Sequence, residues 1–343
     1  MPGTSSAVRV TSQLAHDVVD LARRAPSVHN TQPWTWRWDG RALELYADPS
    51  RALPLTDPEG RNLVLSCGAA LHHARTALHA LGRGVSVERF PEGPDAGPLA
   101  RLELHPEPDG PALRSVRGTT PRETVSPAAA VDAILRRSTD RRRFTSWPVP
   151  AGRLLELASV AAIEGATATA LLDVTERLRV ELLVGRALDR QSGDRALALE
   201  QDAWVDHGPV DGVPAGAIPG PGDPTAGPRH RFSPSGDDGG QLVRHRDGLV
   251  VLSSPTDDPA GWLRAGEGLS ALWLSATVGG LAVVPLSSVV EVEETRDRLR
   301  YDVLDGRTHP LVLLRVGWSA IGRDGLVRTP RRPVDEVLED RSA

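Results

Sequence analysis

The amino-acid sequence predicts an α+β fold, on the basis of three patterns along its 343 residues. Long stretches with apolar side chains at helical spacing predict helices, and short strand-like runs between them predict strands. The pair Asp39-Gly40, flanked by two such runs, is a strong signal for a β-hairpin, so at least part of the sheet is antiparallel. Because 40% of the residues are hydrophobic, the chain can bury a substantial core.

The first half of the chain, residues 1–125, mixes both kinds of element. It opens with an amphipathic stretch that Pro26 ends, because proline disfavours helical backbone at the residue before it. The hairpin follows, and after Asp57-Pro58 a long apolar pattern predicts another helix. The predicted helices cover residues 10–24 and 60–81, and the predicted strands cover residues 34–38, 43–46, 85–90 and 101–105.

The second half, residues 126–343, follows a proline-rich crossover at residues 106–127. Its most irregular part is residues 208–240, whose many glycines and prolines forbid regular structure. A loop of this length inside a compact chain is typically a lid or a disordered insert. The predicted helices cover residues 128–137, 151–161, 176–191 and 259–278, and the predicted strands cover residues 249–252, 281–285 and 311–318.

The composition excludes several classes of function. All 40 basic residues are arginine, so the chain has no P-loop lysine, no Schiff-base lysine for pyridoxal phosphate and no S-x-x-K nucleophile. A net charge of -5 predicts no nucleic-acid partner. The single cysteine, Cys67, excludes an internal disulfide, and residues 1–17 lack the apolar core of a secretory signal. We therefore expect a cytoplasmic protein.

Two segments raise the question of a membrane or a metal, and both favour other interpretations. Residues 269–286 carry no charge and approach the length of a spanning helix. The Gly279-Gly280 pair within them favours a buried helix that ends at the glycines and continues as an extended segment. The adjacent His72 and His73 are expected to point apart on their helix, which argues against a shared metal ion.

A ten-residue loop, APSVHNTQPW at residues 25–34, is the most specific string in the sequence. Ser27 and Asn30 offer short hydrogen-bonding side chains, and the prolines stiffen the loop, so that its geometry is fixed before a ligand binds. The string resembles the APSxxNxQPW loop of FMN-dependent nitroreductases, which implies flavin contacts from Ser27, His29, Asn30 and Gln32. His29 is open to two interpretations, either a proton donor near the flavin ring or a loop histidine with a structural hydrogen bond.

An arginine-rich string, RRSTDR at residues 136–141, resembles the RRSxR element of the same family, which stands at a helix start and holds the flavin phosphate. Arginine suits this task because its planar fork donates two parallel hydrogen bonds to phosphate oxygens. Two registers are open, since this sequence has two extra residues before the aromatic residue that follows. Either Arg137, Thr139 and Arg141 stand for the family's Arg, Ser and Arg, or Arg136 and Ser138 do so.

Two further segments resemble flavin-binding parts of the family. The string GLAVVPLSS, residues 280–288, is similar to the GLG...P[IL]xG segment, in which the proline packs on one flavin face and the following backbone N–H groups point at the ring. The tail RRPVDEV, residues 331–337, resembles the family's RxPLEEVV and implies that Arg331 reaches the phosphate. The first resemblance implies flavin contacts from Pro285, Leu286, Ser287 and Ser288, the last at a position where the family often has glycine.

The distribution of these segments implies one composite site. In nitroreductase homodimers, each flavin takes the RRSxR and P[IL]xG elements from one subunit and the PSxxN loop from the other. Here the loop lies in the first half and the other elements in the second, where residues 161–167 hold only a degenerate counterpart of the loop. The resemblance, which is to the actinobacterial Acg-like branch, thus implies two tandem degenerate nitroreductase-like halves in an intrachain pseudo-dimer with one FMN per chain. A monomer is expected, with a homodimer as the alternative.

The implied function is that of an oxidoreductase of nitroreductase type, in which electrons pass from NAD(P)H through FMN to a small acceptor such as a nitro compound or a quinone. No catalytic residue is assigned, since the flavin carries the chemistry. The alternative is an FMN-binding or FMN-sequestering protein with little turnover, in which residues 208–240 form a lid over the flavin. Both interpretations expect a small-molecule ligand, no metal and no membrane.

Overall fold

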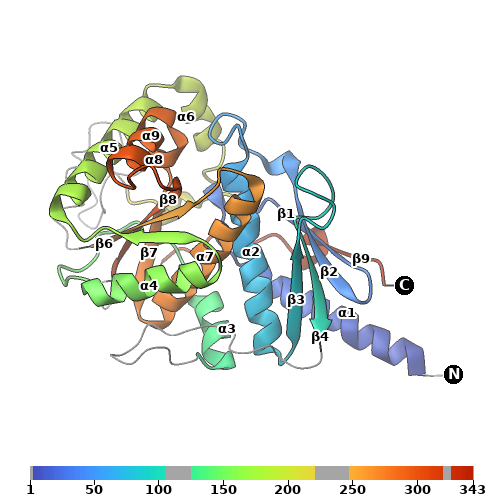
Figure 1. The fold of residues 1–343 in the computed structure, drawn as a ribbon. Coiled ribbons are helices and arrows are strands. Elements are labelled where there is room, and N and C mark those ends of the chain that lie inside the picture. The colour runs from blue at the N-terminus through green and yellow to red at the C-terminus, as the bar shows by residue number, and fades with distance from the viewer. Residues whose placement is uncertain (1–2, 106–124, 221–246, 320–325, 343) are drawn as a thin grey trace.

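The computed structural model describes residues 3–105, 125–220, 247–319 and 326–342. Two β-sheets lie on either side of a central pair of helices, α2 (Arg61–Ala80) and α7 (Pro259–Val278) (Figure 1). The strand order is β3-β4-β2-β1-β9 in the first sheet and β5-β6-β8-β7 in the second. All described strand pairs are antiparallel except β1 with β9, and helices are interspersed among them. The predicted α+β fold is confirmed.

The first sheet is built around the predicted hairpin. Asp39 shapes the turn, because its carboxylate accepts hydrogen bonds from the backbone N–H groups of Arg41 and Ala42 at 2.8 and 2.7 Å. Gly40 has a φ of +92°, which glycine adopts without steric cost. The strands are β1 (Trp34–Trp38), β2 (Ala42–Ala47), β3 (Gly84–Arg89), β4 (Ala100–His105) and β9 (Leu338–Asp340), which pairs in parallel with β1.

The second sheet is covered on both faces. Helix α7 packs on one face, and α5 (Val174–Ser192), α8 (Ser288–Glu291) and α9 (Glu293–Asp302) pack on the other. Strand β6 is buried along its whole length, which explains why it reads in the sequence as a continuous apolar run. The strands are β5 (Thr167–Ala170), β6 (Gly248–Ser254), β7 (Leu281–Leu286) and β8 (His309–Trp318).

Two glycines bring α2 and α7 into direct contact. A Cβ atom added at Gly68 would lie 2.0 Å from the carbonyl oxygen of Leu263, and one added at Gly266 would lie 2.0 Å from that of Leu65. The absence of side chains at these two positions therefore allows the backbones to touch. Apolar residues around the crossing connect both sheets in one core.

Local capping sets the ends of several helices. Helix α7 begins where the Asp258 carboxylate accepts the Gly261 N–H at 2.7 Å, and it ends before Gly279, as predicted. Among the helices of the described ranges, we find none with the length and apolarity needed to cross a membrane. The remaining helices are α1 (Gly3–Ala22), α3 (Pro127–Arg136), α4 (Ala151–Ile163), α6 (Arg195–Asp202) and α10 (Val334–Val337).

The side chains of His72 and His73 do not point apart, so that expectation is wrong. Both Nδ1 atoms lie within hydrogen-bond distance of the Ser270 hydroxyl on α7, at 2.7 and 2.8 Å. His73 Nδ1 also faces the carbonyl oxygen of Ala69 at 3.1 Å, so it carries the proton and donates. Ser270 then donates its own hydroxyl proton to His72. Cys67 is fully buried in the same helix, and burial raises the pKa of its thiol.

The two halves of the chain repeat one arrangement. Strands β3-β4-β2-β1 with helices α1 and α2 correspond in order to strands β7-β8-β6-β5 with helices α4 and α7. Residues 106–124 of the predicted crossover and residues 221–240 of the predicted loop lie outside the described residues. Six described α-helices and strands have no counterpart in the sequence predictions: α6, α8, α9, α10, β5 and β9.

Candidate functional site

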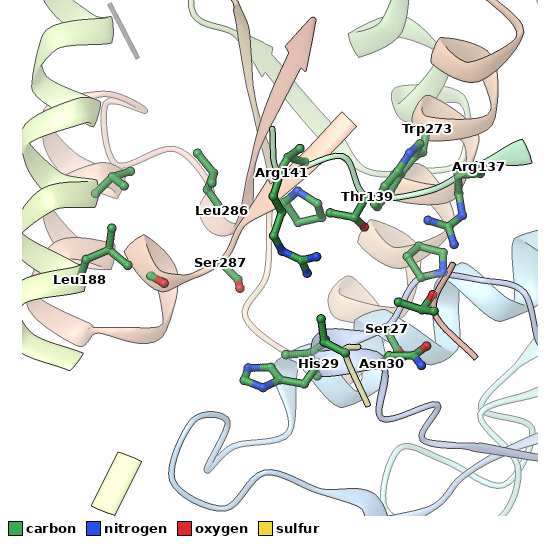
Figure 2. A pocket seen from close by; sticks show the side chains of 18 of the residues that line it. Ser27, His29, Asn30, Arg137, Thr139, Arg141, Leu188, Trp273, Leu286 and Ser287 are labelled. Carbon is green, nitrogen blue, oxygen red and sulfur yellow. The ribbon is translucent and has the colours of Figure 1, made fainter. Parts of the chain in front are cut away.

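Most of the residues that the motifs predict line one cavity, where the two halves of the chain meet (Figure 2). Figure 2 shows Arg137 and Ser27 at one end of this cavity, Leu188 and Ser287 at the other, and the Arg141 guanidinium between them. The predicted residues in its lining are Ser27, His29, Asn30, Arg137, Thr139, Arg141, Pro285, Leu286, Ser287, Ser288 and Arg331.

Residues 25–34, named the PSVHN loop here, have a constrained backbone. His29, Asn30 and Gln32 have φ values of 48°, 57° and 50°, in the left-handed region that side-chain-bearing residues rarely adopt. The surrounding structure holds this conformation, because the Ser27 Oγ accepts a hydrogen bond from the Gln32 N–H at 3.0 Å. Figure 2 shows the His29 side chain pointing toward the Leu188 end of the cavity. The loop thus fixes its side chains before any ligand binds.

Asn30 connects the loop to two distant segments. Its Nδ2 donates to the carbonyl oxygens of Gly212 at 2.9 Å and Pro330 at 3.0 Å, and its Oδ1 accepts from Arg331 Nη1 at 2.8 Å. Gln32 lies outside the cavity lining and is fully buried. It donates from Nε2 to the carbonyl oxygen of residue 210 at 2.9 Å and accepts the N–H of residue 332 at 2.9 Å. Gln32 therefore acts on the site by holding the loop in place.

The buried Arg137 and the half-buried Arg331 form the polar end of the cavity. Arg137 Nη2 and Arg331 Nη2 both donate to the carbonyl oxygen of Arg24, at 3.0 and 3.2 Å, and the Arg137 guanidinium lies 4.6 Å from the centre of the Trp273 ring. Within the described residues, neither arginine has a carboxylate within ion-pair distance, and neither Nε has a hydrogen-bond partner. Among the residues that the structure describes, the pair is a set of cationic donors without a counter-charge.

The pKa values of these two arginines reflect the same imbalance. Burial lowers the pKa of Arg137 to about 10, with a smaller contribution from Arg328. Burial also lowers the pKa of Arg331 well below its ordinary value, and the charges of Arg137, Arg24 and Arg23 add to this effect. A bound anion would oppose both shifts, so the chemistry of this donor set fits a phosphate group.

The structure brings together Arg137, Thr139 and Arg141, rather than Arg136 and Ser138, at the cavity. Arg136 lies outside the lining, about half exposed, and its Nε donates to Asp132 at 2.7 Å in an i,i+4 pair. The string lies at the C-terminal end of α3, not at a helix start, because α3 ends at residue 136 and Arg137 is its C-cap. The extended backbone that follows α3 turns alternate side chains toward the cavity.

Sequence reasoning missed an apolar wall. This wall is formed by Val184 and Leu188 of α5, by Trp273 of α7 and by Val213, which precedes β6 in the chain. No signal in the sequence distinguishes them, because apolar residues at helical spacing look the same whether they face a core or a ligand. Thr329 of the tail is a polar residue in the lining that the motifs did not predict.

The first part of the glycine- and proline-rich segment, residues 208–220, packs beside the PSVHN loop. Asp211 forms an ion pair with Arg51, and its Oδ1 lies 2.8 Å from His207 Nδ1. This anchoring places Val213 in the cavity wall. Among the described residues there is no group of three or more side chains that could hold a metal ion.

Comparison with known proteins identifies close relatives in sequence. No family model matches the chain. A Mycobacterium tuberculosis protein provisionally named as an NAD(P)H nitroreductase is 39% identical over 334 residues, which covers 96% of this chain and 92% of the relative. The M. tuberculosis protein Acg is also provisionally named as an NAD(P)H nitroreductase. It is 31% identical over 346 residues, which covers 97% of this chain and 97% of Acg.

Solved structures show a weaker likeness. The FMN-dependent nitroreductase NfnB of Mycobacterium smegmatis, solved in complex with NADPH, has a TM-score of 0.42 and 18% identity over 61% of this chain and 96% of that chain. A nitroreductase with bound FMN from Bacteroides fragilis has a TM-score of 0.38 and 16% identity over 59% and 94%. The sequence relatives carry the assignment, since they match nearly the whole chain. This chain belongs to the nitroreductase family, in the branch that includes Acg.

Proposed function

We propose that this chain binds one FMN in the cavity and passes electrons from NAD(P)H to a small acceptor such as a nitro compound or a quinone. One observation carries the proposal: the guanidinium groups of the buried Arg137 and the half-buried Arg331 have no carboxylate partner within the described ranges. Buried charges are normally paired, so two such cations call for an anion. A phosphate monoester would satisfy both through charge-assisted hydrogen bonds.

The remaining lining residues divide into two groups along the cavity. Figure 2 shows Thr139 between Arg137 and Arg141, where its hydroxyl would donate to the phosphate, whereas Leu286 and Ser287 lie on the far side of Arg141, where they and Arg141 would orient the flavin ring. Val184 and Leu188 would exclude water at the opposite wall. Bound FMN would supply the redox chemistry, accepting a hydride from NAD(P)H and releasing electrons to the acceptor.

The composite site supports the interpretation of the chain as an intrachain pseudo-dimer. The PSVHN loop comes from residues 1–125, and the arginine string and β7 come from residues 126–343. The repeated order of strands and helices fits two fused nitroreductase-like halves. On this proposal a monomer already contains a complete site and needs no second copy.

A second candidate function is FMN storage without turnover. The observation that favours it is the packing of residues 208–220 against the loop, where Asn30 holds the Gly212 carbonyl and Val213 enters the cavity wall. A segment in this place would restrict access of nicotinamide to the flavin.

One experiment separates these functions. The purified full chain is incubated with FMN, freed of unbound flavin, and mixed anaerobically with NADPH or NADH while the flavin absorbance is followed. Bleaching within seconds supports the oxidoreductase, whereas a bound flavin that stays oxidised supports storage. Failure of the chain to bind FMN at all would overturn both.

A further inference from the structure

A cluster of four charged side chains joins α2, α7, β3 and the end of α4. Glu267 of α7 is fully buried and accepts two hydrogen bonds from Arg89, both at 2.7 Å. Arg75 Nη1 donates to Glu267 at 2.8 Å and to Glu164 at 2.5 Å. Two guanidinium groups thus face two carboxylates, and the set is neutral as a whole. This set is named the Arg75 cluster here.

The repeat between the two halves relates this cluster to the flavin cavity. One shift of 198 positions takes Gly68 of α2 to Gly266 of α7, the two glycines that meet at the helix crossing, and takes Gly82 to Gly280, which precede β3 and β7 with φ values of 73° and 79°. The same shift takes Arg75 to Trp273 and Arg89 to Ser287, both of which line the flavin cavity. Two members of the Arg75 cluster therefore stand at the counterparts of two cavity residues.

The loop of the flavin cavity is absent from the counterpart position. In the first half, residues 23–33 join α1 to β1 and include Ser27 and Asn30. In the second half, only residues 164–166 join α4 to β5, so the loop is missing rather than degenerate. The single charged residue of this short connection, Glu164, directs its carboxylate to Arg75.

The charges at the two positions are balanced in different ways. The arginine pair of the flavin cavity has no carboxylate partner in the described part of the chain, whereas Arg75 and Arg89 have two. Burial raises the pKa of Glu164, but His72 and Arg75 lower it by more, so the carboxylate remains ionised. The arginine pair of the cavity therefore needs an external anion, whereas the Arg75 cluster contains the carboxylates that neutralise its two arginines.

We infer that the Arg75 cluster closes the counterpart of the flavin cavity with internal ion pairs, and that this closure and the missing loop together leave the chain with one flavin site. This inference rests on the proposed function, because it takes the cavity of Arg137 and Arg331 as the flavin site. It assigns the cluster a role in the stability of the closed counterpart, with no contact to the bound flavin, and the missing loop keeps a second flavin from binding even when Arg75 is replaced.

The test compares matched substitutions at the two positions in the full chain. Arg75→Met removes an arginine cation from the cluster, and the identical substitution Arg137→Met removes an arginine cation from the cavity. The flavin-free protein is titrated with FMN to count equivalents bound, and the Tm is measured without flavin. We expect one equivalent for the parent and for R75M, with affinities within about twofold, and a Tm for R75M lower by about 5 to 10 °C. R137M should lose FMN affinity by about 10-fold or more.

Other outcomes overturn the inference in distinguishable ways. Two equivalents for the parent, or loss of FMN from R75M to the extent seen in R137M, would contradict the inference and leave the proposed function standing. An unchanged Tm for R75M would contradict the structural role of the cluster. No binding by the parent would overturn the proposed function, and the inference with it. If R75M does not fold, the milder Glu164→Gln takes its place, with the same expected equivalents and a smaller fall in Tm.

Discussion

Arg331 Nη1 donates a 2.8 Å hydrogen bond to Asn30 Oδ1 and thereby ties the C-terminal tail to the PSVHN loop across 301 positions of the chain. The amide nitrogen of the same asparagine donates to Gly212 and Pro330. One side-chain amide thus sets the positions of the loop, the tail and the start of the glycine- and proline-rich segment relative to one another. Arg331 takes part both in this network and in the cationic end of the cavity.

Because the two side chains share one hydrogen bond, their substitutions should not act independently on flavin binding. Asn30→Ala and Arg331→Met should each raise the Kd for FMN, and the double variant should raise it by less than the product of the two effects. A coupling energy of about 0.5 to 3 kcal/mol is typical of contacting residues. Titration of flavin fluorescence for the four proteins measures it. Independent, multiplicative effects would mean that the contact does not organise the site.

Arg137 and its neighbour Arg136 provide a matched pair for the phosphate contact. Arg137→Met should raise the Kd for FMN by about 10- to 100-fold, because a hydrogen bond to a charged group is worth about 1.5 to 3 kcal/mol. Arg136→Met should leave the Kd nearly unchanged, since that side chain is exposed and pairs with Asp132. Equilibrium dialysis of both variants checks this. A larger loss in R136M would favour the other register of the string.

The contact between α2 and α7 predicts opposite effects of the same substitution at two helical glycines. Gly68→Ala places a methyl group against the backbone of Leu263 and should lower the free energy of unfolding by about 2 kcal/mol or more. Gly185→Ala in α5 meets no atom within 4 Å and should raise it by about 0.5 to 1 kcal/mol. Denaturant unfolding of both variants measures the difference. A stable G68A protein would contradict the close helix contact.

The buried histidines predict loss of stability in mild acid. Burial lowers the pKa of His72 to about 4, from an ordinary value of 6.5, so that between these pH values the unfolded chain binds a proton that the folded chain does not. The free energy of unfolding should therefore fall as the pH drops from about 6.5 to 4, by about 3 kcal/mol from this residue. Urea unfolding across this range tests the slope.

The control for this pH dependence is His72→Gln, which removes the titrating group and keeps a polar side chain beside Ser270. Its stability should be lower at neutral pH but should depend less on pH between 6.5 and 4. An equal slope in the parent and in H72Q would show that other groups govern the acid sensitivity. His73, whose pKa burial lowers in the same direction, contributes the part of the slope that remains in H72Q.

The sequence predicted those parts of the fold that local chemistry determines. Asp39 and Gly40 specify the first hairpin through their own backbone contacts, and Gly279-Gly280 ends α7. Elements that depend on distant partners could not be predicted. Strand β5, with the sequence TATA, has little apolar pattern and exists because β6 pairs with it, and β9 has only three residues.

In the site, the motifs identified the residues, and the three-dimensional arrangement determined what each one faces. The string RRSTDR cannot show which arginine is buried, because that depends on where α3 ends and on the position of Trp273. Gln32 belongs to the motif but faces the carbonyl oxygen of residue 210 instead of the cavity. The contact of His72 and His73 with one hydroxyl also needed the second helix, since it is made across the α2–α7 interface.

The parallel pairing of β9 with β1 also determines when the first sheet can be completed during synthesis of the chain. Trp36 of β1 lies opposite Leu338 of β9. The outer edge of β1 can therefore pair with β9 only after the ribosome has added 302 further residues. Throughout that interval the nascent chain presents an open strand edge, the kind of surface that pairs with other chains and starts aggregation. The part of the molecule made first is thus among the last to be finished.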